Sequence, residues 1–279
     1  MNRMKFSVAM SVYKKDNADY FERALWSITE NQTVLPNEIV LVVDGEVPEK
    51  LNKVIAGYEK NYNIFKVIRL PENKGLGNAL KIALENCTFE IVARMDSDDV
   101  AVSNRFEEQL KYFENYSDLD IVGSDISEFI DLEDNIVAKR VVPKTNEEIA
   151  KYLKRRCPMN HVSVMYKKSS VLKAGGYLDF LWNEDYYLWI RMYQNKCVFM
   201  NSPTVWVNVR VGQDMYRRRG GWKYFKSERR LQKYMKDNKI IGFFTYFINV
   251  AQRFMLQVLM PNWLRGWVFK KFARTREKE

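Results

Sequence analysis

Three carboxylates stand within four positions of the chain, where Asp96, Asp98 and Asp99 follow the apolar run 89–93. Like charges this close repel one another, so the spacing indicates either a solvated turn or a site that receives a cation. Asp-x-Asp at a strand end suits Mn²⁺ or Mg²⁺, because these hard cations bind carboxylate oxygens and take further ligands from water or phosphate. Many turns contain a single Asp-x-Asp, so the motif needs partners elsewhere in the chain.

The first half of the chain has the elements that would bring such partners. We expect apolar strands over 5–13, 38–43, 65–70 and 89–95, and helices over 18–30, 49–61, 74–86 and 105–116. Continuous apolar strands separated by helices predict a parallel sheet with both faces covered. Ligands bind such sheets at the carboxyl ends of the strands. Ser11 to Tyr13, Asp44-Gly45 and the aspartate cluster should therefore meet at one edge.

The second half shows a different pattern. More alternating strands are expected over 121–130, 136–142, 163–166, 197–200 and 205–210, and helices over 145–156 and 183–194. Thr145 and Glu148 have the spacing of a capping box, which favours a helix that begins there. The chain is thus predicted to form an α/β domain followed by a helical extension.

The part of the chain that follows Trp222 is helical in pattern and strongly basic. Between residues 240 and 260 the polar residues recur three to four apart and share one stripe: Thr245, Asn249, Gln252, Arg253 and Gln257. A membrane-spanning helix tolerates such a stripe badly. A helix lying in the membrane interface would use it, with flanking Lys and Arg facing anionic headgroups. The alternative is a helix that packs on the preceding domain or across a homodimer.

Charge and cysteine content narrow the class of protein. With 45 basic and 35 acidic residues the net charge is +10, which predicts an anionic partner such as a nucleotide, a phosphate or a membrane surface. The cysteines (Cys87, Cys157 and Cys197) lack Cys-x-x-Cys spacing. That argues against a disulfide framework or a zinc site and fits a reducing compartment. With no signal-peptide pattern at the N-terminus, a cytosolic protein is expected.

Five segments, in order and spacing, resemble those of the family 2 inverting glycosyltransferases of the GT-A fold, over residues 5 to 215. They are Ser11 to Tyr13, Glu38 to Gly45, Asn73 to Ala79, Arg94 to Asp99, and Gly175 to Tyr177 with Trp182 to Trp189. The resemblance implies an α/β fold with a Rossmann-like, mixed but mainly parallel sheet flanked by helices. A catalytic domain over 1–221 and a basic amphipathic tail over 222–279, associated with a membrane surface, are then expected.

The resemblance also implies roles on the donor side. Tyr13 and Asp44 would hold the nucleotide base, with Asp44 accepting from its N3–H. Asp96 would bind the ribose or support the metal, and Asp98 would ligate the Mn²⁺ or Mg²⁺ that bridges the diphosphate, with Asp99 as a third carboxylate. The predicted nucleotide-sugar site comprises Ser11, Tyr13, Asp44, Lys74, Gly75, Arg94, Asp96, Ser97 and Arg217. Arg94 would neutralise the acidic cluster or pair with a helix carboxylate. Arg217 would close over a diphosphate, or lie in a basic surface turn.

On the acceptor side, the resemblance makes Asp185 the general base that takes the proton of the acceptor hydroxyl. Glu184 would bind the acceptor or orient the site. His161, the sole histidine of the chain, would line the acceptor pocket or serve a structural role. Tyr177 and Trp182 are further acceptor candidates, although some aromatic side chains of this segment must be core.

Together these features imply an inverting hexosyltransferase of bacterial surface-polysaccharide synthesis, of the capsule or O-antigen type. The expected donor is UDP-glucose, UDP-galactose or a UDP-N-acetylhexosamine, and an α-linked donor would give a β-linkage. The expected acceptor is a saccharide or an undecaprenyl-pyrophosphate-linked oligosaccharide at the cytoplasmic face of the plasma membrane, with no role for nucleic acid. The Gln-x-x-Arg-Trp motif of the family's processive synthases is absent, which favours transfer of one sugar.

Two other classes of function remain open at this point. A sugar nucleotidyltransferase would need a glycine-rich phosphate loop after the first strand, where Lys14-Lys15-Asp16 supplies lysines but no glycine. A non-catalytic, basic, membrane-associated binding protein would use the acidic cluster only for structure. Gly75-x-Gly77 lacks the third glycine of a dinucleotide fingerprint and does not follow the first strand.

Overall fold

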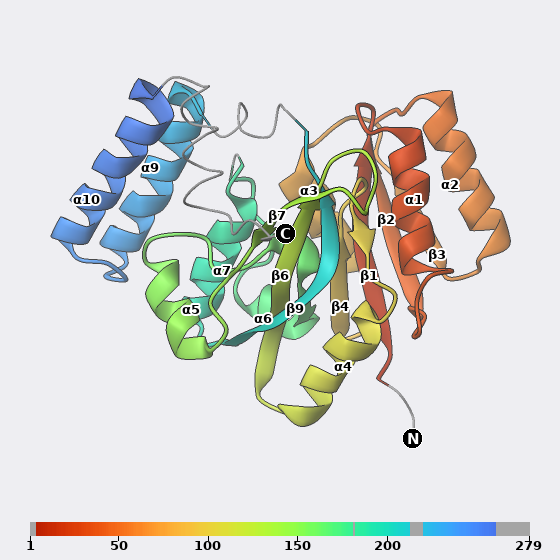
Figure 1. Cartoon of the computed structure of the whole chain (residues 1–279), viewed down its shortest axis with the longest axis horizontal. Coiled ribbons are helices and arrows are strands. Elements are labelled where there is room, and N and C mark those ends of the chain that lie inside the picture. Colours follow the sequence, from red (N-terminus) through yellow and green to blue (C-terminus); the bar gives the residue numbers. More distant parts are fainter. Residues whose placement is uncertain (1–3, 181, 213–219, 261–279) are drawn as a thin grey trace.

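The computed structural model describes residues 4–180, 182–212 and 220–260, and within them one mixed sheet of nine strands organises the chain (Figure 1). The strand order is β3-β2-β1-β4-β8-β6-β9-β5, with β7 paired to β6. The strands are β1 Phe6–Tyr13, β2 Glu38–Asp44, β3 Phe65–Arg69, β4 Ile91–Met95, β5 Val100–Ala101, β6 Leu119–Phe129, β7 Ile136–Arg140, β8 Met165–Lys167 and β9 Val198–Arg210.

The first four strands form the expected parallel half of the sheet. β2 and β4 flank β1, and the register pairs Tyr13 with Asp44 at the carboxyl edge. Because successive side chains point to opposite faces, β2 contributes Val40 and Val42 to one hydrophobic cluster and Leu41 to the other. This double coverage explains why the strands are apolar throughout.

Helices cover both faces of the sheet. On one face lie α1 Ala18–Ile28, α2 Glu49–Asn61 and α4 Arg105–Asn115. On the other face lie α3 Leu76–Asn86, α5 Asn146–Leu153, α6 Lys168–Lys173 and α7 Glu184–Gln194. The helix α5 starts with the predicted capping box between Thr145 and Glu148. The α/β prediction is confirmed.

The second half differs from the prediction in one informative place. Instead of two short strands, β9 runs unbroken beside β6, where Ser124 pairs with Ser202 but Asp125 pairs with Val205. The register shift leaves Pro203 between paired positions, because proline has no N–H to give to a ladder. The sequence therefore looks interrupted where the strand only bulges.

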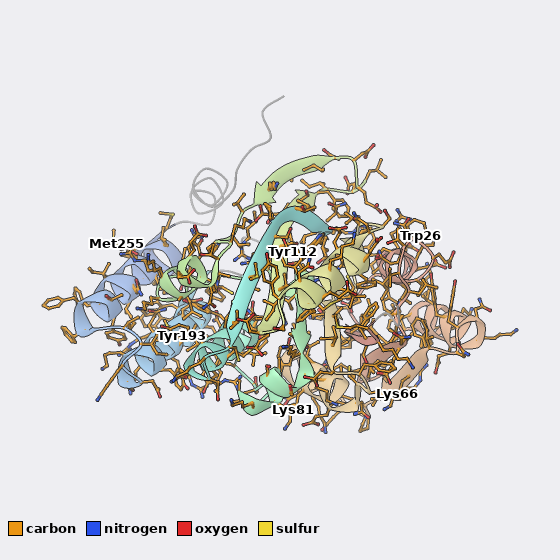
Figure 2. The ribbon with its side chains drawn as sticks, turned by 90° about the horizontal axis from the view of Figure 1, so that it is seen from below. Trp26, Lys66, Lys81, Tyr112, Tyr193 and Met255 are labelled. Carbon is orange, nitrogen blue, oxygen red and sulfur yellow. The ribbon has the colours of Figure 1, made fainter. Side chains whose placement is uncertain are left out.

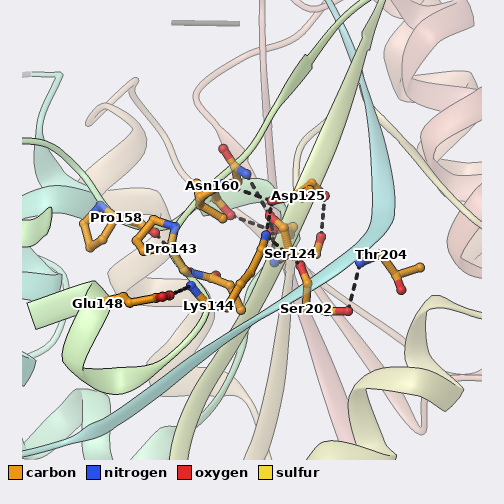
Figure 3. A network of polar contacts seen from close by, with 12 residues as sticks. Ser124, Asp125, Pro143, Lys144, Glu148, Pro158, Asn160, Ser202 and Thr204 are labelled. Carbon is orange, nitrogen blue, oxygen red and sulfur yellow. Dashed lines mark hydrogen bonds and ion pairs between the residues drawn. The ribbon is translucent and has the colours of Figure 1, made fainter. Parts of the chain in front are cut away.

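A polar network fixes the segment that links β7 to β8. Lys144 forms an ion pair with Asp125 of β6, and Asn160 Nδ2 donates to the Ser124 carbonyl at 2.7 Å (Figure 3). Within β9, beside this network, Thr204 N donates to Ser202 Oγ at 3.1 Å. These contacts hold residues 143–160 against the sheet. The segment then leads into the 3₁₀ turn His161–Ser163, which lies against α7.

The C-terminal helices α9 Trp222–Asp237 and α10 Phe243–Phe254, continued by a π-helical turn Met255–Leu259, lie side by side at one end of the molecule (Figure 1). Leu231 and Met235 of α9 belong to the same hydrophobic cluster as Trp189 of α7. The helix α9 thus shares the core of the preceding α/β unit, so a boundary at residue 221 separates segments that pack as one body.

Asn249, Arg253 and Gln257 of the polar stripe face the protein, Gln252 is exposed, and most of the apolar side faces outward. Asn249 is 3% exposed and donates through Nδ2 to the Lys154 carbonyl at 2.9 Å. Arg253 pairs with Glu228 of α9. The exposed apolar residues are Phe243, Phe244, Phe247, Ile248, Met255 and Leu259. Met255 lies at the opposite end of the molecule from Trp26 of α1 (Figure 2). None of the helices within the described residues combines the length and apolarity needed to cross a membrane.

Candidate active site

The carboxyl edge of β2 is built around Asp44. Its buried carboxylate accepts hydrogen bonds from Asn73 Nδ2 at 2.9 Å, Lys74 N at 2.7 Å and Gly75 N at 3.0 Å. A Cβ on Gly45 would lie 2.7 Å from Asn73 N, so only glycine lets the two loops meet. Asp44 therefore fixes the loop that opens α3. Recognition of a nucleotide base by Asp44 stays a prediction, because its oxygens are already engaged.

The carboxyl edge of β4 carries the aspartate cluster. Arg94 is 2% exposed and forms a two-pronged ion pair with Asp96, which confirms its expected neutralising contact. Asp99 is buried and accepts from Arg210 N at 2.8 Å, so it ties the end of β9 to this loop. The Asp98 side chain is exposed, and no basic side chain among the described residues forms an ion pair with it. The three neighbouring carboxylates thus have three different environments.

Asp16, which the sequence did not single out, belongs to the same cluster. Its carboxylate accepts from Tyr13 N at 3.0 Å and from Ser97 Oγ at 2.9 Å. Partial burial is the main cause that raises the Asp16 pKa to about 6, and the Asp96 charge adds to it. The contact joins the loop after β1 to the loop after β4. A lone aspartate after two lysines resembles an ordinary surface turn, so its role depends on the pairing of distant strands.

The acidic cluster suits a divalent cation. Loss of hydration raises the Asp98 pKa to about 6, and the charges of Asp96 and Asp16 contribute. A nearby cation would relieve this repulsion. No group of three His, Cys, Asp or Glu side chains in the described ranges has the geometry of a metal site. The protein would therefore offer one or two oxygens, and because Arg94 engages Asp96, Asp98 is the better placed ligand.

The start of α7 brings two more acidic residues to the same region. Burial is the main cause that raises the Glu184 pKa to about 7, with further contributions from the Asp185 and Asp96 charges. Burial also raises the Asp185 pKa. Asp185 accepts from Tyr186 N at 2.7 Å, and the Cys157 thiol lies 3.7 Å from its Oδ2. A carboxylate with a pKa near neutrality is suited to proton transfer.

Gly77 lets α3 approach the α7 side of the site. A Cβ at Gly77 would lie 3.3 Å from the Leu178 carbonyl oxygen and 3.5 Å from Glu184 Cβ. A Cβ here would crowd the Leu178 carbonyl in the loop before α7 and would be in van der Waals contact with Glu184. The loop that Asp44 holds and the acidic pair of α7 are therefore neighbours.

The predicted acceptor residues differ in their exposure to solvent. Tyr177 is 1% exposed, and its hydroxyl lies 2.9 Å from His161 Nε2. Burial, with the nearby Arg94 charge, holds the His161 pKa well below its usual range, so the ring is neutral. This buried pair of side chains has a structural role. Trp182 is 45% exposed and can reach a ligand. Arg217 lies outside the described residues. Ser11 lies near the carboxyl end of β1, and the backbone N of Lys74 contacts Asp44 at the end of β2.

Arg94 lies at the centre of this arrangement. Its charge acts on the pKa of Asp98 and Asp99 beside it, and on those of Glu184 and Asp185 across the site. Because the interaction of charges falls with distance, these acidic groups lie within range of one guanidinium. The fold thus collects the carboxylates of β4 and α7 into one region, as the sequence predicted.

Replacement of Asp16 by Asn is expected to stabilise the protein. The folded-state pKa of Asp16, about 6, lies above its ordinary value of 3.8, so stability is lost as the pH rises from about 4 to 6. The neutral amide removes this cost and keeps an oxygen acceptor. We expect the free energy of unfolding to rise by about 1–2 kcal/mol at pH 7.5, with a smaller gain at pH 4.5. Urea unfolding at both pH values measures this.

Asp19→Asn is the matched control, since Asp19 lies exposed in the first turn of α1. It should lose a few tenths of a kcal/mol at pH 7.5, because it removes a favourable charge at a helix N-terminus. A destabilised Asp16→Asn variant at pH 7.5 would contradict the assignment of Asp16 to a repelling cluster.

Comparison with known proteins agrees with this geometry. The family model described as glycosyl transferase family 2 matches residues 7–176. The chain is 38% identical over 97% of its length to an Escherichia coli protein described as UDP-Gal:alpha-D-GlcNAc-diphosphoundecaprenol beta-1,3-galactosyltransferase, 97% of which is covered.

Solved structures show the same fold at low identity. S. aureus TarS 1–349 in complex with UDP-GlcNAc superimposes with a TM-score of 0.66 and 16% identity, covering 95% of this chain and 75% of that one. The mannosyltransferase PcManGT from Pyrobaculum calidifontis, solved with GDP-Man and Mn²⁺, gives a TM-score of 0.62 at 14% identity, covering 94% and 72%. The expected GT-A type fold is confirmed, and the chain belongs to glycosyltransferase family 2.

Proposed function

We propose that the protein transfers one sugar from a UDP-sugar to a hydroxyl of a lipid-linked saccharide, with inversion at the anomeric carbon. One observation carries the proposal: Asp16 after β1, the aspartates after β4 and Glu184 of α7 lie close enough for the Asp96 charge to act on the others, and Ser97 donates to Asp16. Such a site offers oxygens for a cation and, in Asp185, a base whose pKa burial raises. Glucose, galactose and N-acetylhexosamine are the candidate sugars.

The proposed chemistry is a single in-line displacement. Asp185 takes the proton of the acceptor hydroxyl while the bond between the anomeric carbon and the UDP oxygen breaks. Glu184, the preceding residue, orients the acceptor. Asp98, with support from Asp96, would hold Mn²⁺ or Mg²⁺, which when bound would stabilise the charge of the leaving diphosphate.

The similar proteins favour this choice of substrates. The E. coli relative is described as acting on a diphosphoundecaprenol-linked sugar with UDP-Gal, and the alignment covers nearly all of both chains. The S. aureus structure holds UDP-GlcNAc. A polysaccharide pathway with a lipid-linked acceptor is therefore the proposed setting.

A donor screen tests the proposal. The full chain, with Mn²⁺, should slowly release UDP from one or a few UDP-sugars, and faster when a lipid diphosphate-linked acceptor is added. A nucleotidyltransferase would instead release pyrophosphate from a sugar phosphate and UTP, and a binding protein would release neither. Absence of UDP release from every UDP-sugar would refute the proposed function.

We further propose that α10 places the protein on an anionic membrane surface. Phe244 is 82% exposed and Phe247 is 64% exposed, although Asn249 of the same helix is buried. A helix on a purely aqueous surface would face the other way. The basic residues Lys236 and Lys239 adjoin α10, and the net charge is +10. Apolar side chains beside cations suit a bilayer with anionic headgroups better than a second copy of this chain, which would repel.

The double variant Phe244→Ser/Phe247→Ser is expected to weaken partitioning to phosphatidylglycerol vesicles by roughly 100-fold or more, because each buried phenylalanine contributes about 1.5–3 kcal/mol. Vesicle flotation measures the partitioning. The control Leu35→Ser/Leu132→Ser removes side chains that are 58% and 70% exposed elsewhere on the surface. It should partition like the unchanged protein. An equal loss of vesicle partitioning in both variants would contradict α10 as the docking face. If the unchanged protein forms a concentration-dependent dimer that the α10 variant abolishes, the apolar face of α10 is instead a homodimer interface.

A further inference from the structure

A basic cavity lies on α9, outside the acidic site. It has a volume of about 280 Å³ and is lined by Lys223, Lys226, Ser227 and Arg230. The residues recur at helical spacing, so the three cations share one face of α9. Resting on the proposed function, we infer that this cavity binds the diphosphate of the lipid-linked acceptor.

Two of the cavity cations contact aromatic rings, which hold them in place. The Lys223 ammonium lies 5.5 Å from the centre of the Trp182 ring, and the Arg230 guanidinium lies 4.6 Å from that of Phe180. None of the three forms an ion pair with a carboxylate of the described residues. Two positioned cations that form no ion pair within the described part of the chain suit a diphosphate, which gains charge-assisted hydrogen bonds from both.

The cavity adjoins the acceptor side of the active site. Ser227 Oγ accepts a hydrogen bond from Asn183 Nδ2 at 3.1 Å. Asn183 is the N-cap residue of α7, and the next two residues are Glu184 and Asp185. Trp182 and Phe180, whose rings adjoin the cations, belong to the loop that enters α7. The helix α9 lies between α7 and α10 (Figure 1).

The spacing agrees with the chemistry of a lipid diphosphate-linked sugar. In such an acceptor, one sugar ring separates the reacting hydroxyl from the diphosphate. A hydroxyl at Asp185 therefore requires a diphosphate site close to, but distinct from, the base. The donor diphosphate belongs at the β4 edge, where Asp98 is located. The α9 cavity supplies the second site, and the neighbouring helix α10 leads to the proposed membrane face.

The test compares two double variants of α9 that remove equal charge at equal spacing. Lys226→Gln/Arg230→Gln alters the cavity, whereas Arg229→Gln/Lys233→Gln removes exposed cations outside it. The acceptor is a short-chain, detergent-soluble diphosphate-linked sugar. In the cavity variant, the ratio of the KM for acceptor to the KM for UDP-sugar should rise about tenfold or more above that of the unchanged protein. The control should change that ratio less than twofold. With an alkyl glycoside that lacks the diphosphate, the two variants should have equal KM values.

Three results would overturn the inference. Equal effects of the two variants would mean a general charge effect. A rise in the KM for UDP-sugar would assign the cavity to the donor diphosphate. A loss that appears only with anionic vesicles would assign it to lipid headgroups. Calorimetric titration with inorganic pyrophosphate, without metal, tests the cavity independently of catalysis: the control should bind it like the unchanged protein, the cavity variant more weakly. Weakened binding in a protein that releases no UDP would refute the proposed function but not the cavity.

Discussion

Asp185→Asn is expected to lower kcat by about 10²–10⁴-fold, because the amide cannot take the proton of the acceptor hydroxyl. The fold should survive, since the amide oxygen can still accept from Tyr186 N, the 2.7 Å contact that Asp185 makes. Binding of UDP-sugar should change little, because the proposed site of the donor diphosphate is the β4 edge, not α7. Steady-state kinetics with titration of UDP-sugar by calorimetry separates the two effects.

Glu184→Gln is the neighbouring control for this assignment. Glu184 has a pKa raised to about 7, so it could serve as base at neutral pH if Asp185 does not. We expect Glu184→Gln to affect the KM for acceptor more than kcat, because the role proposed for Glu184 is to orient the acceptor. Near-normal turnover in Asp185→Asn, with loss of turnover in Glu184→Gln, would transfer the role of base to Glu184.

Asp98→Asn is expected to lower kcat/KM by about 100-fold or more and to weaken Mn²⁺ binding. Charge stabilisation of a leaving group by a bound cation contributes several kcal/mol, and Asp98 is the exposed carboxylate best placed to hold that cation. Stability should not fall, because the substitution removes a charge that Asp96 and Asp16 repel. Activity at increasing Mn²⁺ concentration and urea unfolding are the measurements.

Asp134→Asn, in the turn between β6 and β7, is the matched control and should keep its Mn²⁺ dependence. An Asp98→Asn variant that keeps full activity and the same Mn²⁺ dependence as the unchanged protein would show that the aspartate cluster is structural. Removal of metal by EDTA should in any case reduce the rate of the unchanged protein, with recovery on addition of Mn²⁺ or Mg²⁺.

Local patterns determined the elements and their order. Continuous apolar runs predict buried parallel strands, and β1 to β4 have the predicted positions. The capping box at Thr145 marks the start of α5. Because carboxyl ends of parallel strands share an edge, the convergence of Tyr13, Asp44 and the aspartate cluster also followed from the sequence.

Tertiary contacts decided what each polar residue does. Asp96, Asp98 and Asp99 are near neighbours in the sequence, yet one pairs with Arg94, one is exposed and one holds Arg210 N. Their environments come from β9 and from a buried arginine, which local spacing cannot reveal. Asp16 joined the cluster for the same reason, through its bond with Ser97.

The helix α10 shows most clearly which features the local sequence determines and which the tertiary contacts decide. Its sequence determined an amphipathic helix with one polar stripe, since helical period is a local property. Which side faces the protein depended on partners far along the chain: the Lys154 carbonyl binds Asn249, and Glu228 binds Arg253. Polar groups were drawn inward because these buried partners needed hydrogen bonds, and that left the aromatic side facing outward.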